Sequence, residues 1–322
     1  MLYTVRHVTR FAYEAPISES VMEIRMQPRT NANQRCIQFG LVTVPAARVL
    51  MYQDHDGNIV HHFGLPALHQ RLTVTAEALV ETGPAPLIPY DLGAGAWDRL
   101  DAITASGEFW EYLNPSPFTR RSPLLDALAK EVRLDRRDDP LMLLRRLNTE
   151  LYDRFEYAPQ STRVDSPIDE ALEARKGVCQ DFAHILIALV RQVGIPCRYV
   201  SGYLFHHEGA DRSTESATHA WVETYLPDIG WVGFDPTNNR LAEERHLQVA
   251  FGRDYADVPP TRGVFRGISA VRSELAAAVR VGPAHGGGSD LLPFIPWMSR
   301  DATAGFAEPL SNQTQQQQQQ QQ

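Results

Sequence analysis

The sequence predicts an α+β fold, in which a small all-β domain precedes a core of helices packed on an antiparallel sheet. About 85 residues at the start form short strand-like runs separated by turn residues. A stretch rich in Pro and Gly follows, and then helical patterns that end in a long apolar helix. Further strand-like runs come after that helix. These blocks define the predicted order of domains.

The composition indicates an ordinary globular protein. With 322 residues and 43% hydrophobic content, the chain can bury a sizeable core, and its length suggests two domains. The net charge of -8 argues against nucleic acid as the main partner, because phosphate binding needs a basic surface. No run is long enough to span a membrane, and the opening residues lack a signal-peptide layout. Three cysteines without paired spacing favour a reducing compartment. We therefore expect a cytoplasmic protein that does not bind membranes.

Residues 1–85 are predicted to form the β-rich N-terminal domain. The segment "QDHDGN" at 53–58 separates two strand-like runs and is typical of a hairpin turn. Asp54 and Asp56 also suggest a calcium loop, but the twelve-residue spacing and the terminal Glu of such loops are missing. The expected strands cover residues 2–14, 20–28, 36–44, 48–53, 58–64 and 71–81.

The remaining chain is divided by its composition. Residues 86–122 are rich in Pro, Gly and aromatic residues and are expected to form a surface connector. Residues 123–270 are predicted to form the core, and residues 271–310 a C-terminal extension that is partly strand. The Gln-rich end, 311–322, offers no apolar surface to bury and is predicted to be a disordered tail.

Helical patterns open the core at 122–133, 140–155 and 166–177. For the third helix, Ser166 is the expected cap, Pro167 occupies the first turn, and Gly177 ends the helix. A further helix begins near Cys179 and is apolar on more than one side, which predicts a buried helix that ends at Gly194.

Cys179 lies in the first turn of this buried helix. Free backbone N–H groups and the positive end of the helix dipole favour a thiolate there, and the same N–H groups can donate to an oxyanion. The alternative is that Cys179 is a small buried hydrophobic residue, which is the usual role of a free cysteine. Taken alone, this alternative is favoured.

The strand-like runs downstream change that balance. A nucleophilic cysteine needs a base and a third group that orients the base. Strand alternation in "THAWVETYL" places His219 and Trp221 on one face, and in "WVGFDP" it places Asp235 opposite the apolar Val232 and Phe234. Alternatively, His219 is a half-exposed strand residue and Asp235 a turn residue. The coincidence of all three residues favours a catalytic site.

The hairpin register decides whether these two residues meet. If Leu226 paired with Trp231, the period of two would place Asp235 on the face away from His219. The apolar pattern instead requires an offset of one residue, from an odd loop or a bulge. We therefore predict that an Asp235 oxygen bonds one ring nitrogen of His219, and that the other nitrogen turns toward Cys179.

Metal ions and cofactors are not expected. The pairs His61-His62 and His206-His207 consist of adjacent strand residues, whose side chains point apart. Asp181 is interpreted as a cap of the buried helix, and Cys197 as a packed strand residue.

Three separated motifs resemble the transglutaminase-like cysteine enzymes of papain-like fold. They are "GVCQDFAHI", "THAWVETYL" and "WVGFDPTNN", in the family's order of Cys, His and Asp. The start "YTVRHVTRFAYEAPISESVMEIRMQP" is similar to the N-terminal β-domain of the bacterial branch. The resemblance implies that Cys179 is the nucleophile, His219 the base and Asp235 the residue that orients the base. It identifies no side chain for the oxyanion site.

The activity implied by this resemblance is cysteine-dependent acyl transfer on amide substrates through a thioester acyl-enzyme. The expected substrate is a peptide or protein amide, and either water or a small amine accepts the acyl group. The sequence leaves a transamidase and an amidase or peptidase open. The alternative from another class is a catalytically inactive scaffold or interaction module. An N-acetyltransferase using acyl-CoA is disfavoured, because that family resemblance implies a helical start.

Overall fold

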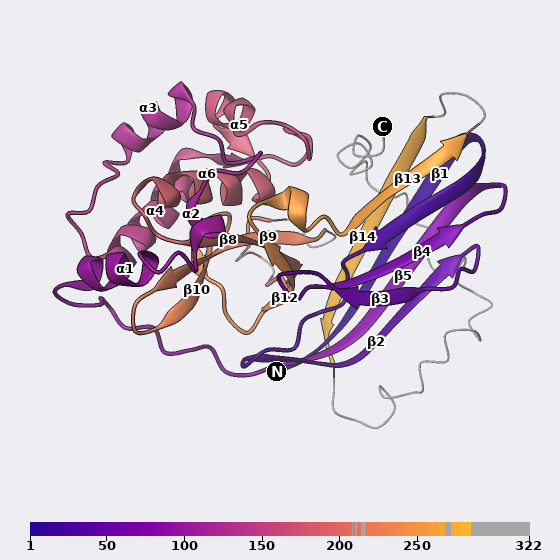
Figure 1. Cartoon of the computed structure of the whole chain (residues 1–322), viewed down its shortest axis with the longest axis horizontal. Coiled ribbons are helices and arrows are strands. Elements are labelled where there is room, and N and C mark those ends of the chain that lie inside the picture. The colour runs from indigo at the N-terminus through magenta and orange to yellow at the C-terminus, as the bar shows by residue number, and fades with distance from the viewer. Residues whose placement is uncertain (208, 210, 214–216, 268–271, 285–322) are drawn as a thin grey trace.

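The computed structural model describes residues 1–207, 209, 211–213, 217–267 and 272–284. Helices surround a five-stranded sheet at one end of the molecule, and a sheet of long strands forms the other end (Figure 1). This arrangement confirms the predicted α+β fold with a β-rich start. In the described part of the chain, no helix combines the length and the apolar character needed to cross a bilayer.

The N-terminal sheet is built around β1 (Leu2–Ile24), a strand of 23 residues. We expected two strands here, at 2–14 and 20–28. The structure instead shows one strand whose pairing register shifts between Ala12 and Ile17 and again between Ile17 and Glu19. Such irregularities accommodate Pro16, which has no N–H for the ladder. The sheet order is β2-β5-β1-β4-β3, with β2 (Gln34–Val44), β3 (Leu50–Gln53), β4 (Ile59–Leu65) and β5 (His69–Thr82).

The predicted turn at 53–58 joins β3 to β4. The Asp54 carboxylate accepts the N–H groups of Asp56 and Asn58 at 3.1 and 2.9 Å, and Gly57 has a φ of +70°. An Asp side chain that holds its own turn in this way is a common hairpin device. The hairpin interpretation is confirmed.

Two late strands complete the N-terminal sheet. β13 (Thr261–Gly267) and β14 (Ser273–Pro283) both pair with β1, on the edge opposite β4 and β5. We expected residues 261–267 in the core unit and the following strand in a separate extension. The difference has a physical reason, because β13 and β14 cover an edge of the long strand β1 that would otherwise be unpaired. The predicted tail, 311–322, lies outside the described residues.

The expected connector contains two helices, α1 (Ala96–Thr104) and α2 (Trp110–Leu113). Leu100 of α1 is completely buried in the main hydrophobic core. Tertiary packing therefore orders a segment whose Pro and Gly content indicates a loop.

The core helices lie close to their predicted positions. They are α3 (Pro123–Glu131), α4 (Pro140–Arg154), α5 (Ile168–Ala174) and α6 (Cys179–Gln192). The predicted ends of α5 are wrong in detail. Pro167 is its N-cap, the Ser166 hydroxyl donates to the Glu170 carboxylate at 2.6 Å, and Arg175 ends the helix with a φ of 53°.

Gly177 serves a different purpose from the predicted helix stop. It belongs to β7 (Lys176–Gly177), which pairs in parallel with β6 (Glu156–Tyr157). A Cβ at Gly177 would lie 2.8 Å from the Cβ of Asp181. Only glycine lets the chain pass this close to the first turn of α6.

The core sheet has the order β11-β10-β9-β8-β12, and α6 packs against β8 and β9. Its strands are β8 (Cys197–Leu204), β9 (His219–Leu226), β10 (Gly230–Asp235), β11 (Arg240–Leu241) and β12 (His246–Gly252). A short 3-10 helix, η1 (Tyr255–Asp257), follows β12. Cys197 is fully buried in β8, as predicted.

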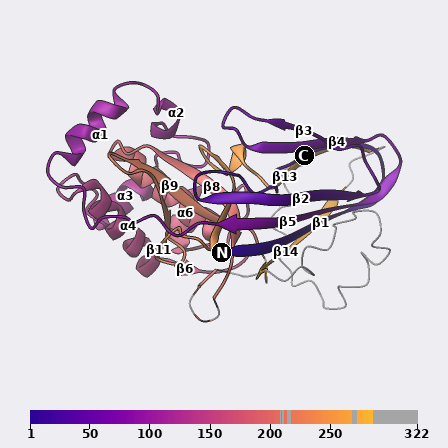
Figure 2. The same cartoon turned by 90° about the horizontal axis from the view of Figure 1, so that it is seen from below.

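One hydrophobic cluster joins the two sheets. It contains Tyr3 and Val5 of β1 and Val279 of β14 together with the apolar side of α6. Seen from below, the N-terminal strands run alongside one another and the helices gather at the other end of the molecule (Figure 2). The N-terminal sheet is therefore packed directly onto the core.

Candidate active site

Cys179 is the first residue of α6 and is partly exposed. The Asp181 carboxylate accepts the Val178 N–H at 2.8 Å and the Thr162 hydroxyl at 2.5 Å. These bonds confirm that Asp181 caps the helix. Burial raises the pKa of Asp181 to about 6. The cap fixes the backbone on either side of Cys179.

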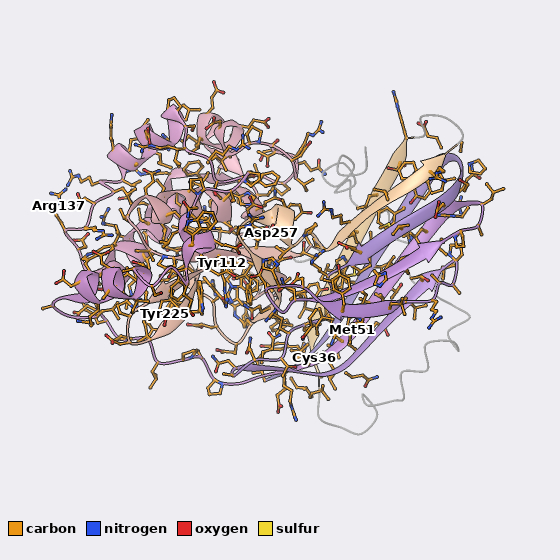
Figure 3. The ribbon with its side chains drawn as sticks, in the orientation of Figure 1. Cys36, Met51, Tyr112, Arg137, Tyr225 and Asp257 are labelled. Atoms are coloured by element: carbon orange, nitrogen blue, oxygen red, sulfur yellow. The ribbon has the colours of Figure 1, made fainter. Side chains whose placement is uncertain are left out.

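The other two cysteines lie in different surroundings. Cys36 is on β2 of the N-terminal sheet (Figure 3), and burial raises the pKa of its thiol to about 11. Burial also raises the pKa of Cys197 to about 11. A thiolate is the reactive form of cysteine, so both residues are poor nucleophiles.

The hairpin β9–β10 has the offset that the apolar pattern requires. Leu226 pairs with Gly230, Thr224 with Val232, and Val222 with Phe234. Residues 227–229 therefore form an odd loop, and Asp235 falls on the face of His219. The register prediction is confirmed.

Asp235 accepts a hydrogen bond from His219, with Nε2 at 2.8 Å from Oδ2. Both side chains are fully buried. Burial opposes the charged form of His219, but the Asp235 carboxylate and Cys179 outweigh it and raise the pKa of His219 to about 10. Burial likewise opposes the Asp235 anion, yet His219 and His246 hold the pKa of Asp235 well below its usual range. The pair is therefore an imidazolium and a carboxylate at neutral pH.

The second ring nitrogen of His219 is not used by the hydrogen bond to Asp235. Nδ1 is buried and makes no hydrogen bond to the described protein groups. His219 and Cys179 line the same cavity, which has a volume of about 110 Å³. Nδ1 is thus available to the Cys179 sulfur, and the interaction with Cys179 helps to raise the pKa of His219.

Two residues missed by the sequence reasoning hold the Asp235 carboxylate. Asn238 donates its side-chain amide to Oδ2 at 2.8 Å and its backbone N–H to Oδ1 at 3.2 Å. His246 places Nε2 at 3.2 Å from Oδ2, while its Nδ1 accepts the Glu243 N–H at 3.1 Å. Since Nδ1 accepts, a neutral His246 carries its proton on Nε2 and donates to Asp235.

The strand that carries His246 has a weak sequence signal. "HLQVAFG" has alternating apolar residues, and this is the one feature that would have found β12. Its pairing with Asp235 spans different strands, so no local spacing predicts the contact.

Among the residues that the structure describes, two groups of three bring possible metal ligands within 4.8 Å of one another. One is His219, Asp235 and His246, and the other is Asp54, His55 and Asp56. In the first group, the His246 nitrogen that faces Asp235 carries a proton and cannot bind a metal in this tautomer. That geometry suits hydrogen bonding.

Trp221 packs beside His219 and His246. Its ring stacks near His219 with centroids 6.1 Å apart and an interplanar angle of 27°, and it meets the edge of His246 at 5.3 Å. A Cβ at Gly202 would lie 2.5 Å from the Trp221 ring, so the glycine on β8 makes room for the indole. The indole keeps water from the buried ion pair.

Sequence comparisons identify the family. The transglutaminase-like superfamily matches residues 126–236, and the bacterial transglutaminase-like N-terminal region matches residues 3–81. An uncharacterized protein of Mycobacterium leprae is 34% identical over 277 residues, covering 85% of this chain and 97% of the relative. One from Mycobacterium tuberculosis strain H37Rv is 36% identical, covering 81% and 87%. The chain belongs to the transglutaminase-like superfamily and carries its bacterial N-terminal region.

The chain is also similar to a protein with a named activity and to a solved structure. A protein-glutamine gamma-glutamyltransferase of Pseudomonas aeruginosa is 30% identical over 163 residues, covering 46% of this chain and 24% of that protein. A crystal structure of a candidate cysteine protease from Cytophaga hutchinsonii superposes with a TM-score of 0.69 at 20% identity, covering 89% of this chain and 92% of that one. The second similarity shows that the two proteins share one fold, which includes both sheets of this chain.

Proposed function

We propose that the protein catalyses acyl transfer from amide substrates through a thioester on Cys179. The observation that carries the proposal is the buried His219–Asp235 ion pair, because His219 lines one cavity together with a cysteine at a helix start. Membership of the transglutaminase-like superfamily supports an enzyme of this kind.

The proposed reaction has two steps. The Cys179 thiolate attacks the carbonyl carbon of the amide, and the Cys179 backbone N–H at the start of α6 donates to the developing oxyanion. The His219 imidazolium then gives its proton to the departing nitrogen as the C–N bond breaks, which leaves the thioester. Water or an amine attacks the thioester, and His219 takes the proton from this acceptor as the thiolate departs.

Asp235 is proposed to orient His219, and Asn238 and His246 to position Asp235. The carboxylate receives donors on both oxygens, so its direction is fixed before substrate binds. This arrangement keeps one nitrogen of His219 on Asp235 and the other toward the sulfur.

The proposed substrate is a peptide or protein amide, with water or a small amine as acceptor. The printed name of the Pseudomonas aeruginosa relative, a protein-glutamine gamma-glutamyltransferase, supports a protein amide and an amine. The similarity covers only a part of that protein, so both acceptors remain part of the proposal.

Labelling with iodoacetamide, followed by peptide mass spectrometry, tests the nucleophile. We expect rapid modification of Cys179 in the wild type, and loss of both rapid modification and amide turnover in Cys179→Ala. Cys36→Ala is the matched control and should behave as the wild type. Turnover that persists in Cys179→Ala would contradict the mechanism. Slow labelling together with no turnover of any amide would favour the inactive scaffold instead.

We also propose that the protein works in a reducing compartment, the cytoplasm. All three cysteines are free thiols, and a catalytic thiol must remain reduced. Fractionation of the source cells tests this assignment. Recovery outside the cytoplasm would contradict it.

A further inference from the structure

The cavity that holds Cys179 and His219 is closed on one side by the N-terminal sheet. Its lining includes His7 of β1 and Leu275, Ala277 and Val279 of β14. The three β14 residues alternate along the strand and so share one face. The register pairs Val279 with His7, which brings the two strands to the cavity together.

This wall is held firmly against the core. Leu275, Val279 and His7 are all buried, and Val279 belongs to the hydrophobic cluster that also contains the apolar side of α6. Tyr203 of β8 donates its hydroxyl to the Met26 carbonyl at 3.1 Å and so accepts from His7 Nδ1, also at 3.1 Å. The bond joins the two sheets beside the cavity.

His7 adds no charge to this wall. Its Nε2 lies 3.3 Å from the Thr9 hydroxyl, so both ring nitrogens have neutral partners. Burial lowers the pKa of His7 to about 4. The ring is therefore neutral at physiological pH.

The rest of the cavity is also uncharged. None of the described lining residues is an aspartate, a glutamate, a lysine or an arginine. A charged group in the part of this space away from His219 would lose its hydration without gaining a partner, which is costly. The volume of about 110 Å³ is below the roughly 150 Å³ of a cavity that holds benzene. The space fits about six heavy atoms or fewer of the acyl group.

We infer that the N-terminal sheet forms the acyl-group subsite of the enzyme, with Ala277 and Val279 setting its depth, and that this subsite takes small uncharged acyl groups. The inference rests on the proposed function of Cys179. It assigns the N-terminal region a part in substrate selection.

Acyl p-nitroanilides test the chemical class, because release of p-nitroaniline reports acyl transfer whichever acceptor follows. Succinamoyl and succinyl p-nitroanilide have nearly the same shape and differ by an amide against a carboxylate. We expect kcat/KM for the neutral compound to exceed that for the charged one at least about tenfold. Equal rates for the two would overturn the uncharged subsite.

Variants of β14 test the wall. Ala277→Leu should lower kcat/KM for butyryl p-nitroanilide at least about tenfold, while the alkylation rate of Cys179 by the smaller iodoacetamide changes less than about threefold. Ala276→Leu is the matched control, since the neighbouring residue points to the other face and is absent from the cavity lining. Wild-type kinetics in both variants would overturn the inference.

Val279→Ala keeps the test decisive if Ala277→Leu fails to fold. A larger subsite should raise the ratio of kcat/KM for octanoyl over butyryl p-nitroanilide about fivefold or more, a gain that unfolding cannot produce. An unchanged ratio would overturn the inference. A failure of the proposed function itself would be seen separately, as turnover of the p-nitroanilides by Cys179→Ala.

Discussion

The N-terminal sheet and the core sheet each place a buried histidine in the lining of the same cavity. The pKa values of the two rings are shifted in opposite directions. Burial lowers the pKa of His7 to about 4, because its partners are the neutral hydroxyls of Tyr203 and Thr9. Burial acts on His219 in the same direction, but the Asp235 carboxylate reverses it and the pKa rises to about 10. The partner therefore decides the charge of a buried histidine.

This difference matches what each region contributes. The core sheet supplies an ion pair that can move a proton, while the N-terminal sheet supplies a neutral wall. The two histidines also affect stability on opposite sides of neutral pH. Between about pH 4 and 6.5 the unfolded chain binds a proton at His7 that the folded chain does not, so stability falls with falling pH. Between about pH 6.5 and 10 the folded chain holds a proton at His219 that the unfolded chain has lost, so stability falls with rising pH.

Replacing His219 is expected to have the largest effect. His219→Phe removes the proton donor to the leaving group and should lower kcat/KM by about 10³-fold or more. Release of p-nitroaniline from butyryl p-nitroanilide measures the loss. His62→Phe on β4, in the N-terminal sheet, is the control and should keep wild-type turnover. A His219→Phe variant within tenfold of the wild type would contradict the role of the ring.

Asp235→Asn keeps the shape of the side chain and removes its charge. We expect turnover to fall by roughly 10²- to 10⁴-fold, because the amide no longer stabilises the imidazolium or selects the tautomer. Urea unfolding at pH 7 and pH 9.5 gives the second readout. The wild type should be less stable at the higher pH, and this loss should shrink in Asp235→Asn. An equal loss in both proteins would show that Asp235 does not set the charge of His219.

His246→Leu removes one donor from Asp235 and leaves the charges of the pair in place. We expect kcat to fall by about tenfold, and the alkaline limb of the pH–rate profile to move to higher pH, because the carboxylate with fewer donors holds the His219 proton more strongly. His246→Gln can restore a donor and should recover part of the rate. A uniform loss with an unshifted profile would indicate only damage to packing.

His7→Gln is expected to have the smallest effect, and it acts on stability rather than on turnover. It removes a titrating group from the N-terminal sheet. Between pH 4.5 and 6 the free energy of unfolding should depend on pH less steeply, by about 1.4 kcal/mol per pH unit, which corresponds to one proton. Urea titrations at several pH values measure this slope. Burial also lowers the pKa of His184 and His206, so an acid-dependent slope should persist. A slope identical to the wild type would show that His7 is not the neutral buried base described here.

The hairpin of β9 and β10 shows how far sequence reasoning reaches. His219 and Asp235 lie 16 residues apart, and the alternation of apolar residues sufficed to predict their shared face and their hydrogen bond. The cap at Asp181 followed in the same way from its position two residues after Cys179, at the start of the helix. Each of these features depends on the backbone within one or two neighbouring elements.

The sequence by itself thus determined the α+β order of domains, the buried helix behind Cys179 and the face that His219 and Asp235 share, because periodicity and turns are local properties of the chain. Tertiary structure alone decided that β13 and β14 return to β1, that His246 donates to Asp235, and that Ala277 lies in the same cavity as Cys179. These contacts join segments that are far apart in the chain or belong to different strands. Packing between elements selects such contacts, and no spacing along the sequence encodes them.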